Sequence, residues 1–85
     1  MDPQELHLKR LRYRSRHRGC KETDVILGHF AETRLDGLSP ALLALYENLL
    51  DEDDADLWLW LTGKNVPEEY KKLLGMMKNI VASGN

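Results

Sequence analysis

The sequence of 85 residues has a single cysteine, Cys20, and this scarcity excludes an internal disulfide. Long hydrophobic runs are also missing, and no stretch approaches the roughly 20 apolar residues of a membrane-spanning helix. The first residues, Met1 to Glu5, lack the apolar segment of a secretory signal. A chain this short has room for one domain and buries only about 60–65% of its unfolded surface, which argues against a large catalytic cleft. We expect a soluble intracellular domain.

Motifs that carry catalysis or bind metals are equally scarce. The sequence contains no phosphate-binding glycine loop, no Cys-x-x-Cys pair and no His-Glu-x-x-His motif. Its histidines, His7, His17 and His29, are widely spaced, so we expect no metal site. Cys20 beside Lys21 leaves a thiol enzyme open as an alternative, because nearby positive charge stabilises a thiolate. No histidine stands at motif spacing to act as its base.

Turn signals divide the chain into helical stretches with short connections. This pattern predicts an all-α fold, a compact single-domain bundle of five short helices that covers residues 1–85 with an ordered core over about 5–82. Ser39 followed by Pro40 is the clearest helix start, because serine caps a helix and proline suits its first position. Residues 82–85 are expected to fray. The predicted helices run from about Glu5 to His17, Glu22 to Asp36, Pro40 to Leu50, 55–62, and Pro67 to Val81.

Apolar residues at three- and four-residue spacing predict the core. Trp58 and Trp60 project about 200° from one another on a helix, so one should be buried and the other half exposed, where it is a candidate partner contact. Gly28 costs roughly 1 kcal/mol inside a helix, which indicates a close approach of another helix. Gly19 and Gly63 are expected to end helices. The residues expected to face inward are Leu8, Leu11, Val25, Ile26, Leu27, Phe30, Ala31, Leu42, Leu45, Tyr46, Leu49, Leu50, Tyr70, Leu73, Leu74, Met77, Ile80 and Val81.

Charge is distributed unevenly along the chain. Residues 1–21 carry seven Lys and Arg against two acids, whereas residues 22–85 carry five against twelve. This polarity favours orientation toward a charged partner, and the simpler explanation is that the basic segment packs against the acidic rest of its own fold. Arg10, Arg14 and Arg18 lie on one helix face, so a nucleic-acid-binding module is an alternative. The acidic remainder and a sequence pI of about 5.9 argue against it.

The junction between the first two predicted helices resembles a known motif. Arg18, Gly19, Glu22 and Asp24 match the Arg-Gly-x-x-Glu motif, with its following Asp, of the succinate dehydrogenase flavinylation factor family. The similarity extends from about Leu8 to Val81, and Cys20 stands where that family usually has methionine. Outside the motif, the matching residues are Arg10, Leu11, Tyr13, Ser15, Arg16, Leu38, Ser39, Tyr46, Leu49, Leu50, Asp54, Asp56, Leu57, Trp60 and Leu61.

The resemblance implies an assembly factor of respiratory complex II and not an enzyme. Family members are small five-helix, chaperone-like helpers that promote covalent attachment of FAD to the flavoprotein subunit of succinate dehydrogenase, which itself supplies the bonding histidine. The chain would hold no cofactor stably and act on FAD held by that partner, with fumarate reductase as a further candidate client. It would bind neither nucleic acid nor membrane and be monomeric when free. The implied partner-binding residues are Arg16, His17, Arg18, Gly19, Cys20, Lys21, Glu22 and Asp24.

Two further expectations concern this segment and the location of the protein. The alternative to partner binding is that Arg18 and Glu22 only cap their helices and pair with each other, an exposed ion pair worth about 0–1 kcal/mol, which does not explain why so many arginines precede them with so few local acids. Bacterial cytoplasm is favoured over the mitochondrial matrix, because no transit segment precedes the predicted domain.

Overall fold

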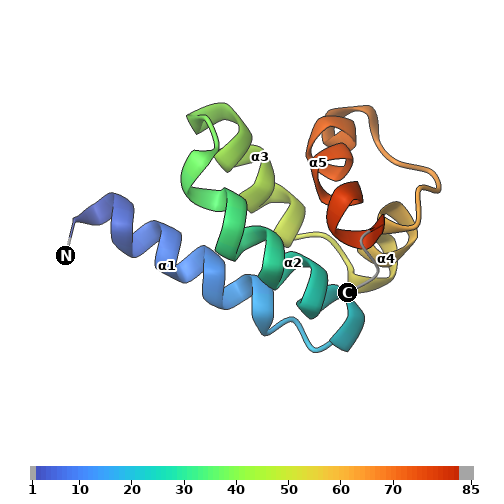
Figure 1. The fold of residues 1–85 in the computed structure, drawn as a ribbon, viewed down its shortest axis with the longest axis horizontal. Coiled ribbons are helices and arrows are strands. Elements are labelled where there is room, and N and C mark those ends of the chain that lie inside the picture. Colours follow the sequence, from blue (N-terminus) through green and yellow to red (C-terminus); the bar gives the residue numbers. More distant parts are fainter. Residues whose placement is uncertain (1, 83–85) are drawn as a thin grey trace.

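The computed structural model describes residues 2–82 and consists of helices joined by short connections (Figure 1). No strand occurs among those residues, so the all-α prediction of five helices is confirmed. Two short 3₁₀ helices lie between the α-helices. The elements are α1 (Pro3–Arg16), α2 (Lys21–Arg34), η1 (Leu35–Gly37), α3 (Pro40–Leu50), α4 (Asp54–Leu61), η2 (Glu68–Tyr70) and α5 (Lys71–Ala82).

Local capping explains where the helices begin. The Ser39 hydroxyl accepts a hydrogen bond from the Leu42 amide at 3.2 Å, and Pro40 follows as the first residue of α3, as predicted. Asp2 accepts from the Gln4 amide at 3.3 Å in the same way, so α1 begins at Pro3 rather than Glu5.

Two predicted boundaries are wrong because a 3₁₀ turn replaces part of the expected α-helix. The second helix ends at Arg34, and the last expected turn is η1. The fifth starts at Lys71, because η2 occupies the turn after Pro67. The side chains of Ile80 and Val81 and the expected fraying at 83–85 lie outside the described part of the structure.

The core follows the predicted apolar faces with one clear exception. Val25 was expected to point inward, yet it is 56% exposed. Thr23 and Leu27 are buried on either side of it in the sequence, and a residue two positions away projects about 200° from each. Trp60 is buried and Trp58 is 43% exposed, which confirms the prediction for this pair. The buried apolar residues are Leu11, Leu27, Phe30, Ala31, Leu35, Leu43, Tyr46, Leu49, Leu50, Leu57, Trp60, Leu61, Tyr70, Leu73, Leu74 and Met77.

The helix α2 is central to the arrangement. It lies alongside α1 on one side and contacts α4 and α5 on the other, while α3 packs against α1 (Figure 1). A Cβ atom at Gly28 would lie 2.9 Å from Cγ of Arg16, so the close approach predicted at this glycine is confirmed. The pairing of α1 with α2 places their connection, residues 17–20, at one end of the bundle.

A buried polar contact links α1 to α3 near the same end. The Ser15 hydroxyl and the Tyr46 hydroxyl are 2.5 Å apart, and Ser15 also lies 2.7 Å from the Leu11 carbonyl oxygen. Burial raises the pKa of Tyr46 to about 12. This contact holds the last turn of α1 in register with α3.

Candidate functional site

The connection between α1 and α2 is held by a carboxylate from within α2. Asp24 accepts hydrogen bonds from the backbone N–H of Arg18 at 3.0 Å and of Gly19 at 3.3 Å. Gly19 has a φ of +101°, in the left-handed region that favours glycine, two residues beyond the C-cap His17. The sharp reversal therefore depends on a glycine for its shape and on Asp24 for its amide hydrogen bonds.

Arg18 anchors this connection to a second one. Its guanidinium donates from Nε to Asp54 Oδ1 at 2.8 Å, and it also donates to the backbone carbonyls of Leu50 and Glu52. Its side chain is only 12% exposed. The alternative in which Arg18 only pairs with Glu22 is thus wrong, because the carbonyls of Leu50 and Glu52 and the first carboxylate of α4 bind the guanidinium instead.

The predicted partner-binding residues differ in what they present to solvent. The exposed members of the segment are Arg16, His17, Gly19, Lys21 and Glu22, whereas Arg18, Cys20 and Asp24 are half-buried.

Several exposed members already have neighbours within the fold. The His17 ring stacks on Tyr13 with ring centres 4.1 Å apart, and Arg16 forms an ion pair with Glu32. The Thr23 hydroxyl lies 3.3 Å from the Cys20 sulfur. Within the described residues Glu22 has no ion-pair partner, and its carboxylate accepts one long hydrogen bond, from the Cys20 thiol at 3.7 Å to Oε2, which leaves the other oxygen available to another molecule.

Two hollows flank the connection, and Gly19 lines one of them while Cys20 lines the other. A shallow groove of about 620 Å³ runs along α2, and a hollow of about 310 Å³ lies between the start of α2 and α4. The sequence predicted that one of Trp58 and Trp60 would be an exposed candidate contact without deciding which, and the structure exposes Trp58 and places it beside this segment. The groove is lined by Arg16, Gly19, Lys21, Asp24, Val25, Gly28 and His29. The hollow is lined by Cys20, Glu22, Asp54, Ala55 and Trp58.

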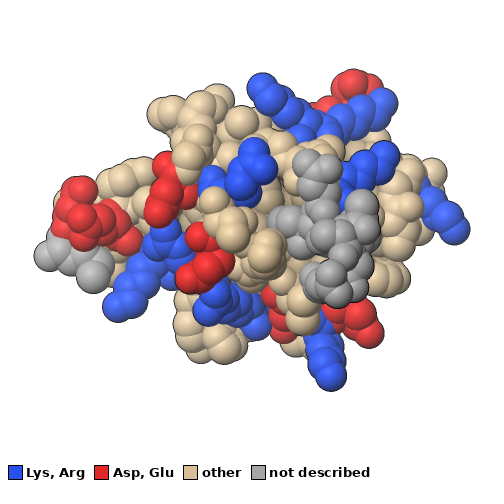
Figure 2. Space-filling view, viewed as in Figure 1, with Lys and Arg blue, Asp and Glu red and all other residues tan. Residues whose placement is uncertain are grey.

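The arginines of α1 are largely neutralised by acids from other elements. Arg12 pairs with Asp36, Arg14 pairs with Asp51 at 2.6 Å, and Arg16 pairs with Glu32. In the connection that follows α1, Arg18 pairs with Asp54. On the left of Figure 2, blue atoms lie beside red atoms instead of forming a continuous basic surface. The basic segment packs against the acidic part of its own fold, and nothing supports the nucleic-acid alternative.

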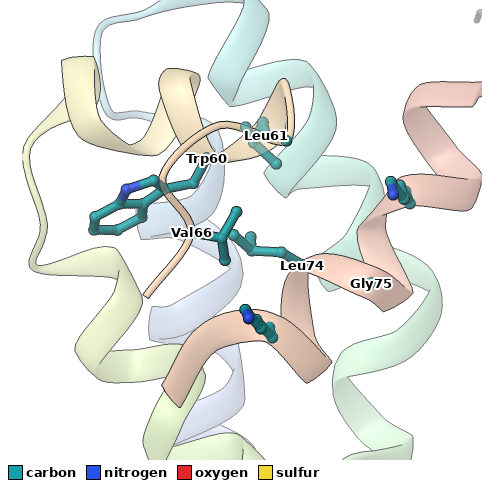
Figure 3. Close-up of a pocket in the computed structure, with 8 residues that line it drawn as sticks. Trp60, Leu61, Val66, Leu74 and Gly75 are labelled. Atoms are coloured by element: carbon teal, nitrogen blue, oxygen red, sulfur yellow. The ribbon is translucent and has the colours of Figure 1, made fainter. Parts of the chain in front are cut away.

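Another hollow, of about 470 Å³, lies between α4 and α5 (Figure 3). Figure 3 labels Trp60, Leu61, Val66, Leu74 and Gly75 around it, and Gly63, Lys71 and Lys78 complete its lining. No acid, cysteine or histidine lines it, and none of residues 16–24 reaches it.

Residues 2–82 hold neither a metal site nor a membrane-spanning helix. No three His, Cys, Asp or Glu side chains among them are grouped to hold a metal ion. None of their helices has the length and apolar character needed to cross a membrane.

The fold and the junction together define a small all-helical domain with an anchored, exposed helix connection. The chain belongs to the family described as flavinator of succinate dehydrogenase, whose model matches residues 9–82. The relatives found are named for assembly and not for catalysis.

Two relatives illustrate the range of the similarity. "Succinate dehydrogenase assembly factor 2, mitochondrial" of Schizosaccharomyces pombe is 45% identical over 65 residues, which is 75% of this chain and 47% of the relative. "FAD assembly factor SdhE" of Acetobacter pasteurianus is 38% identical over 73 residues, which is 86% of this chain and 66% of the relative. The chain thus spans about half to two thirds of their length. No solved structure matches it.

The comparisons overturn the expected bacterial cytoplasmic location. Most of the close relatives, such as those of Schizosaccharomyces japonicus and Meyerozyma guilliermondii, carry the word mitochondrial in their names. The expectation rested on the absence of a transit segment before the domain. Because the chain corresponds to only part of each relative, its first residue gives no information about what precedes the domain.

Proposed function

We propose that this chain binds the flavoprotein subunit of succinate dehydrogenase and promotes covalent attachment of FAD to it. The observation that carries the proposal is the family match over residues 9–82, which includes the whole anchored junction. The chain acts as a helper that holds the flavoprotein with its histidine and flavin aligned, so that positioning lowers the barrier. No observation favours nucleic-acid binding.

The geometry suggests two roles for the eight candidate residues. Five of them touch the flavoprotein, because they surround the turn between α1 and α2. These residues, called the rim below, are His17, Gly19, Cys20, Lys21 and Glu22. Glu22 contributes a charge-assisted hydrogen bond to the partner, and Gly19 permits a close backbone approach.

The remaining three residues position the rim. Arg18 ties it to α3 and α4, Asp24 fixes its backbone, and Arg16 pairs with Glu32 on the neighbouring helix.

We further propose that residues 1–85 act as one monomeric domain that holds no cofactor of its own. FAD stays on the flavoprotein, and fumarate reductase is a second candidate client. Titration of the free chain with FAD is expected to show no saturable quenching of flavin fluorescence. Micromolar binding would contradict the helper role.

The test is covalent flavin fluorescence in a denaturing gel. The chain is co-expressed with a flavoprotein subunit in cells that lack their own factor. We expect fluorescence only when the chain is present. Because a lost charge-assisted hydrogen bond costs about 1.5–3 kcal/mol, Glu22→Ala should weaken the complex by roughly 10- to 100-fold and reduce the signal.

Matched variants separate a docking defect from other effects. Glu69→Ala removes an exposed carboxylate outside the junction and should leave the signal unchanged. The Cys20→Ser variant should retain flavinylation, whereas a loss of flavinylation in this variant would favour the thiol-enzyme alternative. Fluorescence that does not depend on the chain would contradict the proposed function.

A further inference from the structure

The hollow between α2 and α4 has an unusual combination of walls. It places the exposed indole of Trp58 and the small side chain of Ala55 opposite Cys20 and Glu22, with Asp54 also in the lining. An indole exposed in a concave site offers both an apolar face and the negative face of its π-system. No lysine or arginine lines this hollow, and Lys21 instead lines the groove along α2.

The charges around the hollow are predominantly negative. The carboxylate of Glu22 has no ion-pair partner among the described residues and accepts only a long hydrogen bond from the Cys20 thiol, at 3.7 Å. Asp54 pairs with Arg18 through only one of its oxygens. The segment 51–56, which leads into α4, carries five acids. Arg18 adds one positive charge, and the amino ends of α2 and α4 add partial ones. The carboxylates outnumber these positive charges.

A guanidinium fits this environment better than other side chains. Its planar face stacks on an indole, and its N–H groups donate to carboxylates in a fixed geometry. An ammonium forms the ion pair but does not stack in this way. An anion is disfavoured by Glu22 and Asp54.

We propose that this hollow receives an arginine side chain of the client flavoprotein, stacked on Trp58 and bound by Glu22. The inference rests on the proposed function and extends its interface from the α1–α2 connection onto α4. The hollow adjoins that connection, because Cys20 is the last residue of the connection and Glu22 lies in the first turn of α2. Trp58 is the aromatic anchor of the interface, and Arg18 positions the wall by holding Asp54.

The first test needs no flavoprotein. Isotope-labelled chain is titrated with capped arginine and, separately, with capped citrulline, which has a similar shape but no charge. We expect millimolar arginine to shift the Trp58 indole N–H and the amides of Cys20 and Glu22, and citrulline to leave them unmoved. Glu22→Gln should abolish the response, and Glu69→Gln should preserve it. Equal shifts with citrulline, or none at these positions, would overturn the proposal.

The second test uses the client. Trp58→Ala should lower affinity for the flavoprotein subunit at least about tenfold, and Trp58→Phe should lower it less. Leu6→Ala truncates an exposed apolar side chain on α1 and should leave the affinity unchanged. Arginine binding to the free chain without an effect of Trp58→Ala would refute the assignment to the client. If the wild-type chain fails to bind the flavoprotein, the proposed function fails, while the titration still decides whether the hollow takes a guanidinium.

Discussion

At the scale of single residues, Arg18 shows why a motif and a contact surface are different things. The sequence motif contains both Arg18 and Glu22 and does not distinguish the buried residue from the exposed one. The structure half-buries Arg18 against carbonyls from the end of α3 and leaves Glu22 exposed. The partners of Arg18, which are Leu50, Glu52 and Asp54, lie more than thirty residues away in the sequence, so local patterns gave no indication of this anchor.

The anchor makes a stability prediction. Arg18→Ala should reduce the free energy of unfolding by about 1.5–3 kcal/mol, because it removes charge-assisted hydrogen bonds from a half-buried site. Arg12→Ala breaks an exposed ion pair and should cost about 0–1 kcal/mol. Urea denaturation of both variants measures the difference. Equal losses would show that Arg18 does not anchor the junction.

Gly19 makes a second prediction at this scale. An added Cβ meets nothing within 4 Å, so the cost of Gly19→Ala is conformational and should be about 1–2 kcal/mol at a φ of +101°. Gly37 has equally open space without a positive φ, and Gly37→Ala should stay within about 0.5 kcal/mol of the wild type. Thermal unfolding compares the two, and a loss at Gly37 as large as at Gly19 would rule out the backbone explanation.

At the scale of the helices, the sequence predicted a boundary best where a strong local capping signal marks it. Ser39 with Pro40 is a local signal for a helix start, and the structure confirms that α3 begins at Pro40. The second helix ends early, at Arg34, and the fifth begins late, at Lys71, because 3₁₀ turns occupy the rest of the expected helices. Such turns depend on packing as well as on local composition. Val25 was predicted to be buried because its neighbours in the sequence are apolar. The face of α2 that points inward carries Thr23 instead, so Val25 is exposed.

The contact between α1 and α3 makes a prediction about alkaline pH. Burial raises the pKa of Tyr46 to about 12, from 10.0 in the absence of burial. Between these values the unfolded chain loses the phenol proton while the folded chain keeps it, so stability should fall as pH rises from about 10 to 12. The contribution is fully present below pH 10.

Variants assign this pH dependence to its source. Burial, followed by the hydrogen bond to Glu52, also raises the pKa of Tyr70 to about 12. Tyr46→Phe should therefore make the alkaline fall in stability shallower without abolishing it. Tyr13→Phe changes an exposed tyrosine and is the control. The measurement is urea denaturation at several pH values, and an unchanged slope in Tyr46→Phe would refute the assignment.

At the scale of the whole molecule, the uneven charge of the sequence is largely balanced within the fold. Acids from α2, η1, the end of α3 and α4 pair with arginines of α1 and its following connection. The sequence showed the two charge blocks but not their pairing. We expect the chain to flow through a heparin column at low salt. Retention in 0.3 M salt would instead support a free basic surface.

The central claim is that the α1–α2 connection is buried against the client flavoprotein. Cys20 is the only cysteine of the chain, so its reaction rate with a thiol reagent reports on this surface alone. The rate is followed by mass spectrometry of the chain, free and in the complex that co-elutes with the flavoprotein subunit. Lys64→Cys in a Cys20→Ser background reports on an exposed site beyond α4. We predict that complex formation slows modification of Cys20 and leaves the Lys64→Cys thiol unaffected. Co-elution with Cys20 reacting at its free rate would contradict the account.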